Sequence, residues 1–396
     1  MKLWAIVQLS VWASLVYAAP ESGKTPLLKP KLAILGDSIS TAALSYESFR
    51  WDAAHIDAAF TANKRSWPKW ESYSKRFQDA FPEAERKIIE APGRAYSPTM
   101  MLIRLITPTI EGYLVGRSQG FAATEVGVAA EVGNYSGQAA AQVQQLLLVT
   151  GNKAPQQLFV FFTGNDLCRN GFGADKEEKA YEKEMVEEYS ENLMKAIRLF
   201  IDKAELPKDG TDIFVLNHLD ISQLVDKTIL NKKVHAFGEK EAMSCREFRF
   251  FETKKKIADE VKNPLLKQVV SLAAKGTTTL PPGKNLCPRI LNVTPPEGDI
   301  TNEKYLKQVA QVKAASLVYQ KATEATVEKA KSYLSDLDDK GVKKDVRVHH
   351  LESPSDLQFD EDEVANDCFH LSLKGQEKVA DTVLAEMRRR KLLVEK

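Results

Sequence analysis

The fold of this chain is decided by Lys31-Leu32-Ala33-Ile34-Leu35-Gly36-Asp37-Ser38, an apolar run that ends in a glycine-containing turn. A short apolar run bounded by turn residues is typical of a buried strand. Similar runs occur at residues 157–162, 212–216 and 346–348, with a shorter candidate at 87–90. Helical periodicity lies between them, over residues 136–148, 176–200, 302–334 and, after Ser372, 374–393. Strands that alternate with helices predict an α/β fold, a parallel-sheet α/β/α sandwich with flavodoxin-like layering.

The N-terminal residues have the pattern of an export signal. Lys2 precedes an apolar stretch over residues 3–16, and Val16-Tyr17-Ala18 matches a small-residue cleavage site. We therefore expect residues 1–18 to be a signal peptide and the protein to be secreted or periplasmic. Residues 19–396 are expected to form a single domain, with a large inserted region at about 221–300 before the last strand.

Charge and cysteine content narrow the functional classes. The 55 basic and 54 acidic residues leave a formal charge of only +1. Nucleic-acid binding needs a basic patch, so this balance argues against a nucleic-acid-binding protein. The cysteines match no zinc spacing, and an exported chain can oxidise them. We expect two disulfides among Cys168, Cys245, Cys287 and Cys368, with all three pairings open and free buried thiols as the alternative.

Polar residues suited to ester chemistry lie at predicted strand ends and before the last helix. Ester hydrolysis needs a nucleophile, a base, a carboxylate that orients the base, and donors for the oxyanion. Ser38 follows the first predicted strand, and Asn165 follows the run at 157–162. Asp367 and His370 are three residues apart, so a single turn places both on one face. Each motif alone is a common turn, but together they predict a Ser–His–Asp site.

These motifs resemble the sequence blocks of the GDSL/SGNH hydrolase family. Leu35-Gly36-Asp37-Ser38 resembles its nucleophile block, and Asp367-Cys368-Phe369-His370 matches its Asp-x-x-His block. Gly164-Asn165-Asp166 is similar to its Gly-x-Asn-Asp block without the spacer. Asn134-Tyr135-Ser136-Gly137, followed by Gln142, resembles the block whose glycine amide faces the oxyanion, with Gly133 as a competing glycine. The blocks occur in family order over most of the chain.

Within the family, the phospholipase B-like branch is the most similar. Its extended blocks resemble Asn165-Asp166-Leu167-Cys168, Asp367 to Ser372 and, less closely, Cys287-Pro288. The resemblance implies an SGNH-like fold, catalysis by Ser38, His370 and Asp367, and no metal or organic cofactor. It also implies an oxyanion hole from the amides of Ser38 and Gly137 and the side chain of Asn165. Asp37 and Asp166 are expected to brace turns.

Three functions remain open at this point. The first is hydrolysis of lipid esters, with transient contact to a membrane surface, and the second is O-acetyl ester hydrolysis on surface or cell-wall polysaccharide. The third is a non-catalytic binding module. An aromatic segment at residues 39–81 is expected either to wall an acyl pocket or to pack in the core, and Asp360-Glu361-Asp362-Glu363 to be exposed acids. Acyl length, oligomeric state and the role of residues 221–300 stay undetermined.

Overall fold

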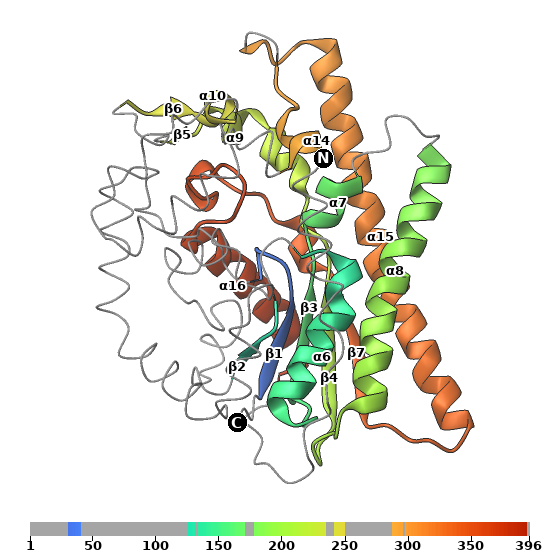
Figure 1. Ribbon diagram of the computed structural model, residues 1–396. Coiled ribbons are helices and arrows are strands. Elements are labelled where there is room, and N and C mark those ends of the chain that lie inside the picture. The colour runs from blue at the N-terminus through green and yellow to red at the C-terminus, as the bar shows by residue number, and fades with distance from the viewer. Residues whose placement is uncertain are drawn as a thin grey trace, which may run out of the picture.

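The chain is described by a computed structural model, which covers residues 31–40, 126–130, 134–170, 178–234, 241–249, 287–295 and 298–393. Within these residues a five-stranded parallel sheet forms the centre, with strand order β2-β1-β3-β4-β7 (Figure 1). The strands are β1 Leu32–Gly36, β2 Val126–Val128, β3 Gln157–Phe161, β4 Thr211–Leu216 and β7 Val346–Leu351.

Four of the strands confirm the prediction from apolar runs. All five residues of β1 are buried, because the strand pairs on both sides and its two faces are covered. β7 extends to Leu351, beyond the predicted end at 348. β2 was not predicted, since its three residues Val-Gly-Val are too short to show a pattern. The candidate strand at 87–90 lies outside the described residues.

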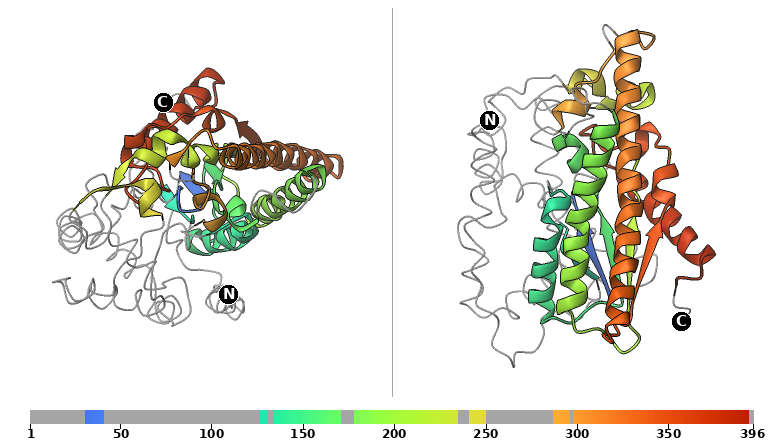
Figure 2. Two further views of the ribbon diagram at one scale, coloured as in Figure 1. Left: turned by 90° about the horizontal axis from the view of Figure 1, so that it is seen from above. Right: turned by 90° about the vertical axis from the view of Figure 1, so that its right-hand side faces the viewer.

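Helices cover both faces of the sheet, as Figure 2 shows. One face carries α6 Ala139–Thr150, α8 Glu178–Lys203 and α15 Glu303–Asp339, and the other carries α16 Leu373–Arg389. All four were predicted, although the first turn of the expected helix at 136–148 is a 3-10 helix, η2 Ser136–Gln138. Ser372 caps α16 as expected, since its hydroxyl accepts the amide hydrogen of Gly375 at 3.2 Å. The architecture is therefore α/β.

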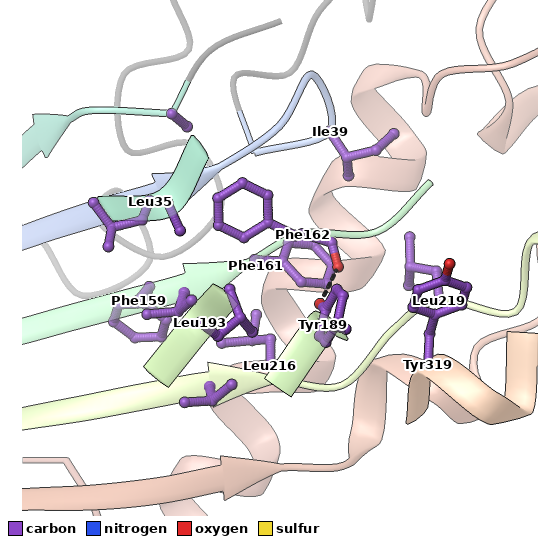
Figure 3. Packing of buried hydrophobic residues seen from close by; sticks show 14 of the residues in the cluster. Leu35, Ile39, Phe159, Phe161, Phe162, Tyr189, Leu193, Leu216, Leu219 and Tyr319 are labelled. Carbon is purple, nitrogen blue, oxygen red and sulfur yellow. Dashed lines mark hydrogen bonds between the residues drawn. The ribbon is translucent and has the colours of Figure 1, made fainter. Parts of the chain in front are cut away.

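Aromatic side chains fill the layer between the sheet and its long helices (Figure 3). The rings of Phe159 and Phe214 stack with centroids 4.9 Å apart. Tyr189 and Tyr319 meet edge to face at 5.4 Å, and the Tyr189 hydroxyl donates to the carbonyl of Phe162 at 2.9 Å. Large buried rings with satisfied hydroxyls make this layer a firm base for the loop that follows β3.

Several shorter elements connect the strands and the long helices, some of them within the expected insertion at 221–300 and others outside it. The shorter elements are α7 Asn165–Asn170, α9 Lys227–Asn231, α10 Cys245–Phe248, α14 Pro288–Leu291, η3 Ile221–Val225, η5 Ser353–Asp356, η6 Glu361–Glu363 and the antiparallel pair β5 Lys233–Val234 and β6 Met243–Ser244. Where it is described, the region at 221–300 therefore consists of short elements joined by turns.

The four cysteines form two disulfides. Cys168 pairs with Cys287 and Cys245 with Cys368, at Cα–Cα distances of 4.8 and 5.6 Å. This confirms the expected oxidation and selects one of the three open pairings. Two disulfides indicate an oxidising environment, such as the extracellular space or the periplasm. The predicted signal peptide lies outside the described residues, and none of the described helices is long and apolar enough to cross a membrane.

Candidate active site

The turn that carries the predicted nucleophile, Ser38, begins where β1 ends, at Gly36, and we call it the nucleophile turn (residues 36–40). A Cβ atom at this position would lie 2.3 Å from a backbone carbonyl oxygen of β3, so only glycine fits. The next residue, Asp37, accepts hydrogen bonds from the amides of Ile39 at 2.9 Å and Thr163 at 2.7 Å. The buried carboxylate therefore ties the turn around Ser38 to the loop after β3.

A glutamine holds the end of β1 from the helix side. Gln142 of α6 is buried, and its side-chain nitrogen donates to the carbonyl of Gly36 at 2.7 Å. Its side-chain oxygen accepts the amide hydrogen of Gly36 at 2.8 Å. One side chain thus satisfies both polar backbone groups of the residue that opens the nucleophile turn. In the sequence, Gln142 was only part of the family resemblance.

Ser38, His370 and Asp367 form one hydrogen-bonded chain. The Oγ atom of Ser38 lies 2.7 Å from Nε2 of His370, and Nδ1 of His370 lies 2.5 Å from Oδ2 of Asp367. All three residues are buried, with at most 3% of their surface exposed. A hydroxyl, an imidazole and a carboxylate in this order can move a proton from the hydroxyl to the ring.

The backbone between Asp367 and His370 forms a turn, which we call the catalytic turn (residues 367–370) because its two ends are predicted catalytic residues. Oδ1 of Asp367 accepts the amide hydrogens of Phe369 at 3.1 Å and His370 at 2.9 Å, while Oδ2 contacts the ring. Cys368 has a φ of 61°, a left-handed conformation that costs a non-glycine residue about 1–2 kcal/mol. Burial would raise the pKa of Asp367, but the His370 ring and these hydrogen bonds hold it below its usual value.

The two other predicted oxyanion donors belong to connected loops at the same sheet edge. Asn165 opens α7 directly after β3, and its side-chain nitrogen donates to the carbonyl of Asn134 at 2.7 Å. Asp166 accepts hydrogen bonds from the amide and hydroxyl of Ser136 at 2.9 and 2.6 Å. Gly137 is exposed in the first turn of η2, where amide groups have no acceptor within the helix.

Asp37 and Asp166 brace loops, as expected from the sequence. Burial raises the pKa of both carboxyls, and it raises that of Asp166 to about 7 although Ser136 donates two hydrogen bonds to it. Each carboxylate joins a loop after one strand to a neighbouring loop. Both carboxyl groups therefore stabilise the loops around the site, and neither belongs to the hydrogen-bonded chain of Ser38, His370 and Asp367.

A small apolar cavity is lined by sequence neighbours of the predicted site residues, although Ser38, Asp367 and His370 do not line it themselves. Its volume is about 30 Å³, close to the share of one water molecule in the liquid. Ile39, Gly164 and Phe369, each next in sequence to a predicted site residue, line it. The Phe369 ring also meets the His370 ring edge to face at 4.9 Å. The cavity is therefore small, and Phe369 connects its wall to the His370 ring.

One prediction from the sequence is wrong, some concern residues outside the described ranges, and one residue near the site was not predicted. The prediction that residues 360–363 are exposed is wrong for Glu363, which is 5% exposed and accepts the amide hydrogen of Asp360 at 2.8 Å and a hydrogen bond from Lys378 at 2.7 Å. Gly133 and residues 41–81 of the aromatic segment lie outside the described residues. Arg249, which contacts the catalytic turn, was missed because no sequence motif marks it.

Comparison of the chain with known protein families and with curated proteins finds no match. In the described part of the chain, no three histidine, cysteine, aspartate or glutamate side chains gather where they could hold a metal ion.

Proposed function

We propose that this protein is a serine ester hydrolase of the GDSL/SGNH type. The observation that carries the proposal is the buried chain from Ser38 through His370 to Asp367, with contacts of 2.7 and 2.5 Å. Two features support it: the resemblance of the motifs and the position of Ser38 beyond the carboxyl end of a parallel strand, where such sheets bind ligands.

In the proposed reaction, Oγ of Ser38 attacks the acyl carbon while Nε2 of His370 takes the hydroxyl proton. The negative charge that develops on the carbonyl oxygen would be stabilised by the amides of Ser38 and Gly137 and by the side chain of Asn165. The bond to the alcohol oxygen then breaks, and His370 gives that oxygen its proton. Water, deprotonated by His370, then attacks the acyl-serine; the bond between the acyl carbon and Oγ breaks, His370 returns the proton to Oγ, and the carboxylic acid leaves. Asp367 orients the ring throughout.

We propose lipid esters as the first substrate class. The motifs around Asn165 and His370 resemble the phospholipase B-like branch, cysteines included. Such a substrate would bring the protein into transient contact with a lipid surface outside the cytoplasm, which fits the oxidised cysteines.

An O-acetyl esterase that acts on carbohydrate is the second candidate. The observation in its favour is the apolar cavity lined by Phe369, whose ring contacts the His370 ring; its volume of about 30 Å³ suits a small acyl group better than a long acyl chain. The two candidates share one mechanism and differ in the acyl group that the site accepts.

The deciding experiment measures hydrolysis of p-nitrophenyl acetate, butyrate and octanoate by the purified protein. Ser38→Ala should lower turnover roughly 10⁴-fold or more. Ser40→Ala is the matched control, because Ser40 is also buried in the turn that carries Ser38, but its hydroxyl donates to the carbonyl of Phe161 at 2.7 Å. Labelling by a fluorophosphonate, followed by mass mapping, should find the adduct on Ser38.

The acyl preference then separates the two candidates. Faster turnover of octanoate supports a lipid substrate, and activity confined to acetate supports the O-acetyl esterase. If no ester is hydrolysed and Ser38 is not labelled, the proposal fails and the non-catalytic binding module gains support. If Ser38→Ala retains full activity, Ser38 is not the nucleophile.

A further inference from the structure

The first part of the inserted region holds the loop that leads to the catalytic turn. Gln223 makes two hydrogen bonds with the backbone of this loop, and the ammonium of Lys232 makes two more. The loop atoms bound are the carbonyl of Leu357, the amide of Phe359 and the carbonyls of Glu361 and Val364, each at 2.7 Å. The loop is therefore attached to the inserted region at four points.

The attachment continues into the catalytic turn itself through α10. Cys245, the first residue of α10, forms the disulfide with Cys368. Arg249, one turn later, donates from Nη2 to the carbonyl of Cys368 at 3.2 Å. The amide of Arg249 donates to the carbonyl of Cys245 at 3.1 Å, which keeps the two residues one helical turn apart. The centre of the catalytic turn is thus held by its side chain and by its backbone.

Arg249 is a cation in a fully buried position. Its side chain is 0% exposed, and Nη2 also donates to the carbonyl of Leu224 at 2.6 Å. Nε and Nη1 have no hydrogen-bond partner among the described residues. Burying an arginine against carbonyl groups is costly, and an apolar side chain of the same volume would avoid that cost. The presence of a positive charge at this buried position therefore needs an explanation.

The charged and titratable groups around Arg249 provide this explanation. The charged or titratable groups that act on it are Tyr305 of α15 and Asp367 of the catalytic turn, while Arg246 and Glu247 lie on its own helix. Burial lowers the pKa of Arg249 to about 10, against the opposite influence of Tyr305 and Asp367, so the side chain is protonated at neutral pH. A fixed positive charge here favours an ionised Asp367, the carboxylate that contacts the His370 ring.

We propose that Arg249 is a positioning residue of this site. It holds the carbonyl of Cys368, so that the two sides of the catalytic turn keep Asp367 and His370 in register. Its charge favours the ionised form of Asp367, the carboxylate that orients the His370 ring. The inference depends on the proposed esterase function, and it assigns the start of the inserted region to support of the catalytic turn.

The test compares Arg249→Met, which removes the charge, with Arg249→Lys, which keeps it but cannot reproduce the planar fork. Arg347→Met is the matched control, because Arg347 pairs with Asp212 at the amino ends of β4 and β7, away from the site. Hydrolysis of the preferred ester is followed from acidic to alkaline pH. Fluorophosphonate titration counts intact sites, so that kcat is expressed per folded site.

Arg249→Met should lower kcat roughly tenfold to a hundredfold, because a displaced base transfers protons poorly, and should leave KM within about twofold. Its acid limb should move to higher pH by about half a unit or more, since the pair then holds a proton more firmly. Arg249→Lys should lose less kcat and keep the acid limb of the wild type. Arg347→Met should match the wild type in both.

A wild-type kcat per site in Arg249→Met would overturn the inference, and so would equal acid limbs in the Met and Lys variants. If Arg249→Met does not fold, Arg249→Gln, which also removes the charge, takes its place with the same expected and the same contradicting results. An inactive wild type whose Ser38 is not labelled defeats the proposed function instead. In that case NMR signals of the His370 ring, followed against pH, still decide: a displacement only in the Met variant supports the inference, and superimposable curves overturn it.

Discussion

Replacing Gln142 with leucine should destabilise the protein strongly, because one side chain satisfies two buried backbone groups. The two hydrogen bonds to Gly36 measure 2.7 and 2.8 Å, and Gln142 is buried. Leucine has a similar volume, so the main loss is hydrogen bonding. Each backbone group left buried without a partner costs about 1–3 kcal/mol, and the pair therefore about 2–6 kcal/mol. That is a large part of the roughly 5–15 kcal/mol by which domains are stable.

The assay is urea unfolding of the purified variants, followed by circular dichroism. Gln145→Leu is the control, since Gln145 lies on the same helix and is exposed, and it should change the free energy of unfolding by no more than about 0.5 kcal/mol. Because Gly36 opens the nucleophile turn, Gln142→Leu should also lower ester turnover at Ser38. A free energy of unfolding within about 1 kcal/mol of the wild type would refute the reasoning.

Three further predictions concern buried groups near the sheet edge. Burial lowers the pKa of His218 from 6.5 to about 4, so the protein should lose about 3 kcal/mol of stability as the pH falls from 6.5 toward 4. His218→Phe should remove this loss in urea unfolding at the two pH values, and an equal loss in both proteins would contradict the prediction. The pKa of Asp166 is raised to about 7, so its ionisation should destabilise the protein as the pH rises from about 4 through 7. Asp166→Asn should flatten that part of the Tm–pH curve, and an unchanged slope would count against the assignment. If the apolar cavity receives the acyl group, Leu224→Ala, which enlarges it, should raise the activity ratio of longer to shorter esters by about fourfold per accepted methylene, whereas a constant ratio would place the acyl group elsewhere.

The strands and helices were largely readable because their signals are local. Apolar runs at 32–35 and 212–216 lie in the strands β1 and β4, and helical periodicity after Ser372 marks α16. β2 could not be predicted, because its pairing with β1 and not its composition makes it a strand. Glu363 reads as one acid among four, but its contact with Lys378 places it in the interior.

The candidate site divides in the same way. The residue types at Ser38, Asp367 and His370, the order of the motifs and the three-residue spacing of the last two are properties of the sequence. That Ser38 meets His370 at 2.7 Å is a property of the fold, since the tertiary structure has to close their separation of 332 residues.

The sequence by itself determined the alternation of strands and helices and the identity of the chemical groups, since both depend on neighbours within a few residues. Only the tertiary structure decided which cysteines pair, why Gln142 is buried and what Arg249 contacts, because these contacts join segments more than 100 residues apart. Local preferences carry no information on such pairings. The contacts between distant segments form when the packed core brings four parts of the chain to one edge of the sheet: the carboxyl ends of β1 and β3, the start of the inserted region and the catalytic turn.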